Sequence, residues 1–184
     1  MADAVSRINK PDIQLSNGLY YDFYNPDPDV VTIEVIAHAL ANICRYTGHV
    51  SRFYSVAEHS VRASYLGPDN EALERLMHDA GEALVGDVST PLKRQLGGYA
   101  EIEERAEILC ATKFGYQYPY PPSVKQADLI MLATEKKFLL PQTEVQWEVL
   151  KGIEPMVGDL RNAAGTPSHW KQKFIDRYEE LKRV

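Results

Sequence analysis

NEALERLMHDAGEALV, residues 70–85, has the apolar spacing of an amphipathic helix. The adjacent pair His78-Asp79 lies within this stretch, and Glu82 follows about one helical turn later on the same face. An imidazole and two carboxylates on one helix face indicate a chemical role, because general acid–base catalysis needs such groups close together. The apolar positions that we expect this helix to bury are Leu73, Leu76, Met77, Ala80 and Leu84.

A second histidine and a second aspartate indicate a metal site around this pair. His59 lies one predicted helix upstream, and the short connection makes the two helices antiparallel neighbours. Asp128 must then come from a later helix that packs across both. Two imidazole nitrogens and two carboxylate oxygens suit zinc, manganese, cobalt or iron, and they leave positions for water and substrate. Any one of these residues alone would favour a structural polar role, but the four together predict a mononuclear site made by His59, His78, Asp79 and Asp128.

The remaining sequence predicts an all-α fold, a single helical bundle with the metal site between its helices. Ser55 and Glu58 have the spacing of a capping box, which starts a helix at Val56, and Thr166-Pro167 is a good start for the last helix. Strand signals are almost absent apart from an extended piece at 18–23. The expected helices span 31–44, 56–66, 70–85, 98–114, 123–139 and 167–182, with a short helix at 144–151, a loop at 86–97 and a turn at 116–122.

Composition limits the possible functions. The 184 residues include 26 acidic and 20 basic side chains, for a net charge of −6, which argues against a protein that coats nucleic acid. A small anionic substrate needs only a few local cations. Two cysteines without a CxxC pairing predict a reducing cytosol, bacterial or that of a phage-infected host. The N-terminus has no signal-peptide core, and no apolar run of membrane-spanning length occurs.

Three blocks carry a family resemblance: VAEHS at 56–60, MHDAGEALVGDVSTPLK at 77–93 and KQAD at 125–128. They resemble the HD-domain phosphohydrolases of the 5'-nucleotidase-like branch, which includes bacterial deoxyribonucleoside 5'-monophosphatases and phage-type dATP triphosphohydrolases. The resemblance covers roughly residues 31–140, the expected HD core, between an N-terminal extension at 1–30 and a C-terminal helical extension at 141–184 that packs on the core. It implies metal ligation by the four residues above, a catalytic role for Glu82, and a sugar- or water-contacting role for Asp87.

The same resemblance implies four substrate contacts. Arg45 would contact phosphate, and the Tyr46 ring would pack on the nucleoside. Lys93 and Lys125 are the remaining cations expected near the site, and three cations exceed what one monophosphate needs. Structural alternatives exist for each residue: Arg45 could cap the preceding helix, Tyr46 could pack, the lysines could be solvated and Asp87 could be a turn residue. The acidic run at 101–107 is expected to be a solvated helix face.

The expected function is divalent-metal-dependent hydrolysis of a deoxynucleotide at its α-phosphate. We expect a dNTP triphosphohydrolase, dATP-like in its substrate, that releases deoxynucleoside and triphosphate. The alternative is a deoxyribonucleoside 5'-monophosphatase, and a non-catalytic nucleotide sensor is disfavoured because no ligand or acid–base residue is missing. The cofactor would be one zinc, cobalt or manganese ion, with a second ion on the substrate phosphates left open. No nucleic-acid polymer or membrane partner is expected, and the resemblance implies a homo-oligomer, a dimer or hexamer.

Overall fold

A computed structural model describes residues 10–162 and 165–183 of the chain. Parts of the two predicted extensions, at 1–9, 163–164 and 184, lie outside the described residues, as does most of the N-terminus on which the signal-peptide prediction rests. The helices and one small hairpin make up the regular secondary structure of the described residues, which confirms the predicted all-α class. The helices are α1 (Ile33–Asn42), α2 (Val56–Ala63), α3 (Ala72–Met77), α4 (Glu82–Val85), α5 (Thr90–Lys93), α6 (Tyr99–Phe114), α7 (Pro122–Phe138) and α8 (Pro167–Lys182).

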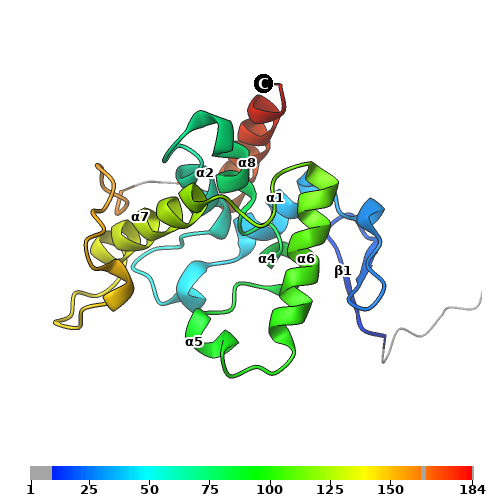
Figure 1. Cartoon of the computed structure of the whole chain (residues 1–184), viewed down its shortest axis with the longest axis horizontal. Helices are drawn as coiled ribbons and strands as arrows, with labels where there is room; N and C mark the ends of the chain where they lie inside the picture. Colours follow the sequence, from blue (N-terminus) through cyan, green and yellow to red (C-terminus); the bar gives the residue numbers. More distant parts are fainter. Residues whose placement is uncertain (1–9, 163–164, 184) are drawn as a thin grey trace, which may run out of the picture.

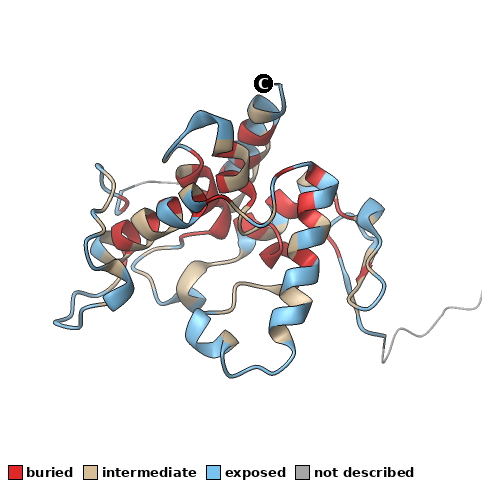
Figure 2. Cartoon of the chain, in the orientation of Figure 1, coloured by how far each residue is buried: buried red, intermediate tan, exposed pale blue. Residues whose placement is uncertain are grey.

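The main core lies where α1 meets α2, α4 and α8 (Figure 1). Ile36 and Leu40 of α1, Leu76 of α3 and Phe174 of α8 are all 0% exposed there. Figure 2 shows buried residues concentrated in this central region, whereas α5 and the loop after it are largely exposed. Helix α8 packs against α1, α2 and α3, so the end of the chain closes the bundle.

A smaller apolar cluster fixes α7 beside α2. It joins residues of α2 and α7 to the loop before α2 and to the segment after α7. The backbone adds to this packing, because Ser51 N–H donates to the Leu139 carbonyl at 2.9 Å, and the Arg52 guanidinium donates to the Leu160 carbonyl at 2.8 Å. The buried members of the cluster are Tyr54, Ala63, Ala127, Met131, Leu139 and Leu160. Their packing holds one face of α7 toward α2.

The predicted single helix over 70–85 is wrong. A turn at 78–81 separates α3 from α4, and a 3₁₀ helix, η3 (Asp69–Glu71), precedes α3. Within the turn, the Ala80 N–H donates to the Met77 carbonyl at 2.9 Å and the Glu82 N–H to the Asp79 carbonyl at 3.0 Å, which is i→i+3 bonding. Successive side chains on a regular α-helix point about 100° apart. The tighter turn instead lets two adjacent side chains approach one site. Leu73, predicted to be buried, is only partly so.

Other differences concern short elements. The extended piece predicted at 18–23 is the second half of an antiparallel hairpin, in which β1 (Asp12–Gln14) pairs with β2 (Tyr20–Asp22). The loop at 86–97 contains α5, and the short helix predicted at 144–151 is a single 3₁₀ turn, η4 (Glu148–Leu150). Two further 3₁₀ turns are η1 (Pro28–Val30) and η2 (Arg45–Gly48). The Ser55 cap is confirmed, because its hydroxyl accepts from the Glu58 N–H at 3.1 Å.

Candidate metal centre

Three elements bring the four predicted ligands together. His59 comes from α2, His78 and Asp79 from the turn after α3, and Asp128 from α7. The two histidine Nε2 atoms are 3.2 Å apart, and His78 Nε2 lies 3.3 Å from Asp79 Oδ1. His59 Nε2 lies 3.7 Å from Asp128 Oδ1 and 3.8 Å from Asp79 Oδ2. Ligand atoms of His59, His78 and Asp128 all fall within 4.8 Å of one another, a spacing that fits one metal ion.

The hydrogen bonds behind the two imidazoles determine which nitrogens face this point. His59 Nδ1 lies 2.6 Å from Glu135 Oε1, and His78 Nδ1 lies 2.8 Å from the Arg75 carbonyl oxygen. Both partners are acceptors, so both Nδ1 atoms carry the proton. In the neutral rings the two Nε2 lone pairs then face each other and two carboxylates. A divalent cation would satisfy all of these electron pairs at once, so the residues fit a divalent metal.

Glu135 is a site residue that the sequence reading missed. It lies on α7, is 0% exposed, and contacts His59 from the side opposite to the other ligands. Its second oxygen, Oε2, accepts from the Tyr46 hydroxyl at 2.6 Å and lies 3.4 Å from Arg45 Nε. Burial alone would raise the pKa of Glu135, but Arg45 and His59 bring it down to about 2. The signal in the sequence is its spacing from Asp128, since seven residues are two turns of one helix face.

Arg45 and Tyr46 both reach the centre, although not as free substrate contacts. The Arg45 Nη1 atom donates to Asp79 Oδ2 at 3.3 Å. Tyr46 and Thr47 adopt positive φ angles of 57° and 52°, in the left-handed region that non-glycine residues rarely occupy. The guanidinium contact answers the alternative that Arg45 only caps α1. The Tyr46 hydroxyl is engaged by Glu135, which leaves the ring as its possible substrate surface.

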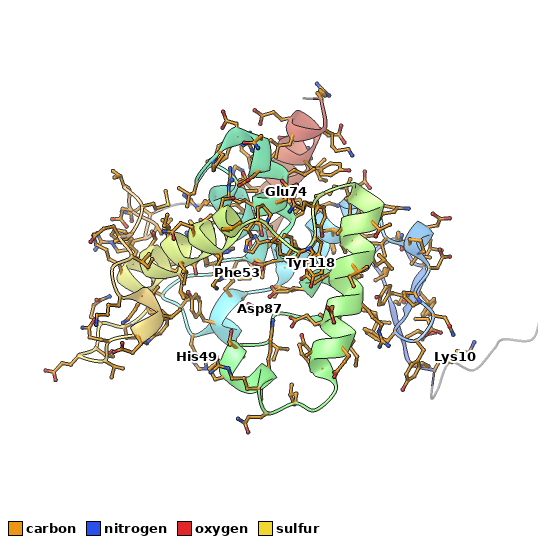
Figure 3. The ribbon with its side chains drawn as sticks, viewed as in Figure 1. Lys10, His49, Phe53, Glu74, Asp87 and Tyr118 are labelled. Atoms are coloured by element: carbon orange, nitrogen blue, oxygen red, sulfur yellow. The ribbon has the colours of Figure 1, made fainter. Side chains whose placement is uncertain are left out.

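Glu82 lines a pocket of about 450 Å³ together with His78 and Asp79. The residue is 8% exposed, and its Oε2 atom is buried without a hydrogen-bond partner among the described residues. Burial raises the pKa of Glu82 well above its usual range, and repulsion from Asp79 and Asp87 adds to the rise. The pKa of Asp87 is also raised by burial. Figure 3 shows Asp87 near the middle of the molecule, on the segment that joins α4 to α5.

The two predicted lysines lie at the site but are already paired. Lys93 lines the pocket, forms an ion pair with Glu103, and has its Nζ 4.0 Å from Glu82 Oε1. Lys125 Nζ lies 2.9 Å from Asp128 Oδ2, and its side chain is 67% exposed. Each lysine therefore places its ammonium beside the candidate centre, where a substrate phosphate would compete with a carboxylate.

The acidic run at 101–107 was predicted to be a solvated helix face, and this is only partly correct. Glu103, Glu104 and Glu107 line the pocket from α6. Burial raises the pKa of Glu107 to about 8. The Tyr120 hydroxyl contacts both Glu107 Oε2 and, at 3.2 Å, the His78 carbonyl oxygen. The Tyr120 hydroxyl is the donor in this arrangement, and it has two acceptors within reach, one on Glu107 and one on the backbone of His78.

Across residues 10–162 and 165–183, no helix combines the length and apolar character needed to cross a membrane. No family model matches the chain. An uncharacterized protein of Rhodobacter capsulatus is 35% identical over 124 residues, which are 62% of this chain and 63% of that relative. YfdR, an uncharacterized protein of Escherichia coli strain K12, is 43% identical over 165 residues, which are 90% of this chain and 91% of YfdR. The chain therefore belongs to the same protein family as YfdR.

Proposed function

We propose that this protein is a divalent-metal-dependent phosphohydrolase of the HD type, which hydrolyses deoxynucleotides at the α-phosphate. The observation that carries the proposal is the convergence of two imidazole Nε2 atoms and two carboxylates beside a buried glutamate, Glu82, whose Oε2 atom has no hydrogen-bond partner among the described residues. His59, His78, Asp79 and Asp128 would hold the ion. When bound, a zinc, cobalt or manganese ion supplies Lewis-acid polarisation of a phosphoryl oxygen and lowers the pKa of water.

The chain's own residues account for the proton and charge requirements. Glu82 has an Oε2 atom at the pocket without a hydrogen-bond partner among the described residues, and burial raises the pKa of this carboxyl group, as is common for a general acid–base residue. Arg45 lies against Asp79 and would exchange part of this contact for a phosphate oxygen. The Nζ atom of Lys93 lies 4.0 Å from Glu82 Oε1, and its charge would offset charge that develops on the phosphoryl group.

We propose a deoxynucleoside triphosphate as the substrate, with release of deoxynucleoside and triphosphate. The support is the presence of two lysines in addition to Arg45, because each extra phosphate needs a counter-charge. Lys93 and Lys125 lie on different elements, α5 and α7, and both have an ammonium within 4.0 Å of a carboxylate of the site. A phosphate chain that extends from the metal centre would pair with these two ammonium groups and replace the carboxylates as their partners.

A deoxynucleoside 5'-monophosphate is the second candidate, and one observation favours it. The pocket wall holds Glu103, Glu104 and Glu107 against one ammonium, that of Lys93. Glu103 already pairs with this lysine. The negative charge of Glu103 and Glu104 would repel the β- and γ-phosphates of a longer chain, whereas a sugar and base would tolerate it.

The test is chromatographic product analysis after incubation with each dNTP or dNMP and with cobalt, manganese or zinc in turn. Deoxynucleoside together with intact triphosphate would support the triphosphohydrolase. Turnover of dNMP without dNTP would support the nucleotidase instead. Metal-loaded protein that hydrolyses neither class would contradict the proposed function. An Asp79→Ala variant, which lacks a ligand, controls for contaminating phosphatases.

A further inference from the structure

We infer that Glu135 is a positioning residue shared by the metal centre and the Arg45–Tyr46 turn, so that metal binding and substrate binding are coupled through one carboxylate. The inference rests on the proposed metal-dependent function, and it assigns a role to a residue outside the predicted ligand set. It requires that the two oxygens of Glu135 serve two different parts of the site.

The two oxygens of the Glu135 carboxylate have different hydrogen-bond partners. Oε1 lies 2.6 Å from His59 Nδ1, and Oε2 accepts from the Tyr46 hydroxyl at 2.6 Å. Both Glu135 and His59 are 0% exposed, so water does not compete for these bonds. A carboxylate behind a ligating imidazole fixes its tautomer and its ring orientation, which keeps Nε2 directed at the metal.

The Tyr46 contact holds a segment that would not adopt its conformation unaided. Tyr46 and Thr47 both lie in the left-handed region, where a side chain is strained. Such conformations persist when surrounding contacts specify them, and the bond from the Tyr46 hydroxyl to a buried carboxylate is such a contact. Arg45 leads into this turn, so the position of its guanidinium depends on the same anchor.

Arg45 contacts both Glu135 and one of the predicted metal ligands, Asp79. Its Nε lies 3.4 Å from Glu135 Oε2, and its Nη1 donates to Asp79 Oδ2 at 3.3 Å. One guanidinium thus spans the carboxylate behind His59 and a carboxylate of the ligand set. Loss of Glu135 would release the His59 ring and the Arg45–Tyr46 turn at the same time. A residue that merely neutralised the partly buried Arg45 would stabilise the fold without affecting metal affinity.

The experiment measures metal affinity without any substrate. Chelator-treated protein is titrated with cobalt, followed by visible absorption and by calorimetry, for wild type, Glu135→Gln, Tyr46→Phe and the double variant. Glu179→Gln, at an exposed carboxylate on α8, is the matched control. Circular dichroism confirms folding. We expect Glu135→Gln to weaken cobalt binding roughly 10–100-fold with an altered cobalt spectrum. Tyr46→Phe, which contacts no predicted ligand, should weaken it less, and the two effects should not add.

Each outcome decides the inference. Cobalt affinity equal to wild type in a folded Glu135→Gln protein would overturn it, as would strictly additive effects in the double variant. If Glu135→Gln does not fold, Tyr46→Phe decides alone: reduced cobalt affinity supports the coupling, and unchanged affinity overturns it. The titration contains no nucleotide, so its result does not depend on the proposed substrate. If the protein shows this coupling but hydrolyses no deoxynucleotide, the proposed substrate is rejected and the role of Glu135 stands.

Discussion

Glu82 is the residue on which the proposed hydrolysis depends most directly. Glu82→Gln keeps the size of the side chain and removes its ability to accept a proton. We expect turnover to fall by roughly 10²–10⁴-fold, the usual contribution of a general acid–base group. Metal content should stay at the wild-type level, since His59, His78 and Asp128 form the compact ligand group without it. The measurements are kcat and metal stoichiometry on the same sample.

A matched control for this variant is Glu101→Gln on α6, where the carboxylate is exposed. It should leave both kcat and metal content unchanged. Full activity in Glu82→Gln would remove this residue from the mechanism, and loss of the metal would instead make it a ligand.

Glu107 should make stability depend on pH. Its pKa is raised by burial from 4.5 to about 8, so the folded state favours the protonated acid. The stabilisation is therefore complete below about pH 4.5 and is lost as the pH rises toward 8. Glu107→Gln mimics the protonated form. We expect its free energy of unfolding, relative to wild type, to increase by about 1 kcal/mol or more between pH 5 and pH 8, since one pKa unit corresponds to about 1.4 kcal/mol.

Urea unfolding of chelator-treated wild type and Glu107→Gln at several pH values measures this difference. The chelator removes metal binding as a second source of pH dependence. Two stability curves that stay parallel from pH 5 to pH 8.5 would show that Glu107 is ionised in the folded protein.

The residues predicted from sequence and those missed differ in the kind of signal that they carry. His78 and Asp79 are adjacent, and His59 and Asp128 complete a ligand set that is rare by chance. Glu135 has no such local pattern. Its spacing from Asp128 places both on one face of α7, but burial of that face depends on packing against α2, which periodicity does not report.

At the level of elements, the turn at 78–81 shows why the predicted helix 70–85 failed. Apolar spacing predicts the buried face, and a turn with i→i+3 bonds keeps enough of that phase to bury Leu76, Met77, Ala80 and Leu84 as expected. The sequence here contains no proline. Gly81 gives no clear stop either, yet a Cβ there would lie 3.0 Å from Glu107 Oε1. The close approach of α6 to the turn is a tertiary fact that favours glycine.

A substitution in helix α8 can test how much this helix contributes to the stability of the core. Phe174 is 0% exposed, on a helix that packs against α1, α2 and α3. Phe174→Ala should lower the free energy of unfolding by about 3–5 kcal/mol, through lost burial and a residual cavity. Urea denaturation measures the change. Glu179→Gln on the exposed side of α8 should shift it by no more than about 0.5 kcal/mol. Equal effects of the two variants would mean that α8 adds little to folding.

The whole molecule determines what the sequence could and could not predict. Apolar content and helical periodicity were sufficient for the all-α class and for the long helices α6, α7 and α8. Only the second strand of the hairpin was predicted, as the extended piece at 18–23, and the first strand was missed because strands of three residues carry almost no alternation. The pocket was missed because its wall combines α6, the turn after α3 and Tyr118 and Tyr120, which only the folded chain brings together.

This dispersed origin of the site leads to a prediction about the whole fold. The ligands come from α2, the turn after α3, and α7, so a bound ion joins elements that are separate in the unfolded chain. An ion that binds only the folded state at 100 times its Kd adds about 2.7 kcal/mol. For a chain of this size, that corresponds to a rise in Tm of roughly 5–10 °C.

Thermal unfolding with cobalt and with excess chelator measures this rise. Asp128→Asn is the internal comparison, because it weakens one ligand while preserving the shape of the side chain. Its own Tm differs from that of wild type for several reasons, including the ion pair with Lys125, so the quantity to compare is the metal-induced shift within each protein. A large shift in wild type and a small one in Asp128→Asn would place the ion among these residues. Equal shifts in both would locate metal binding elsewhere, and the convergence of four ligands would then need a structural explanation.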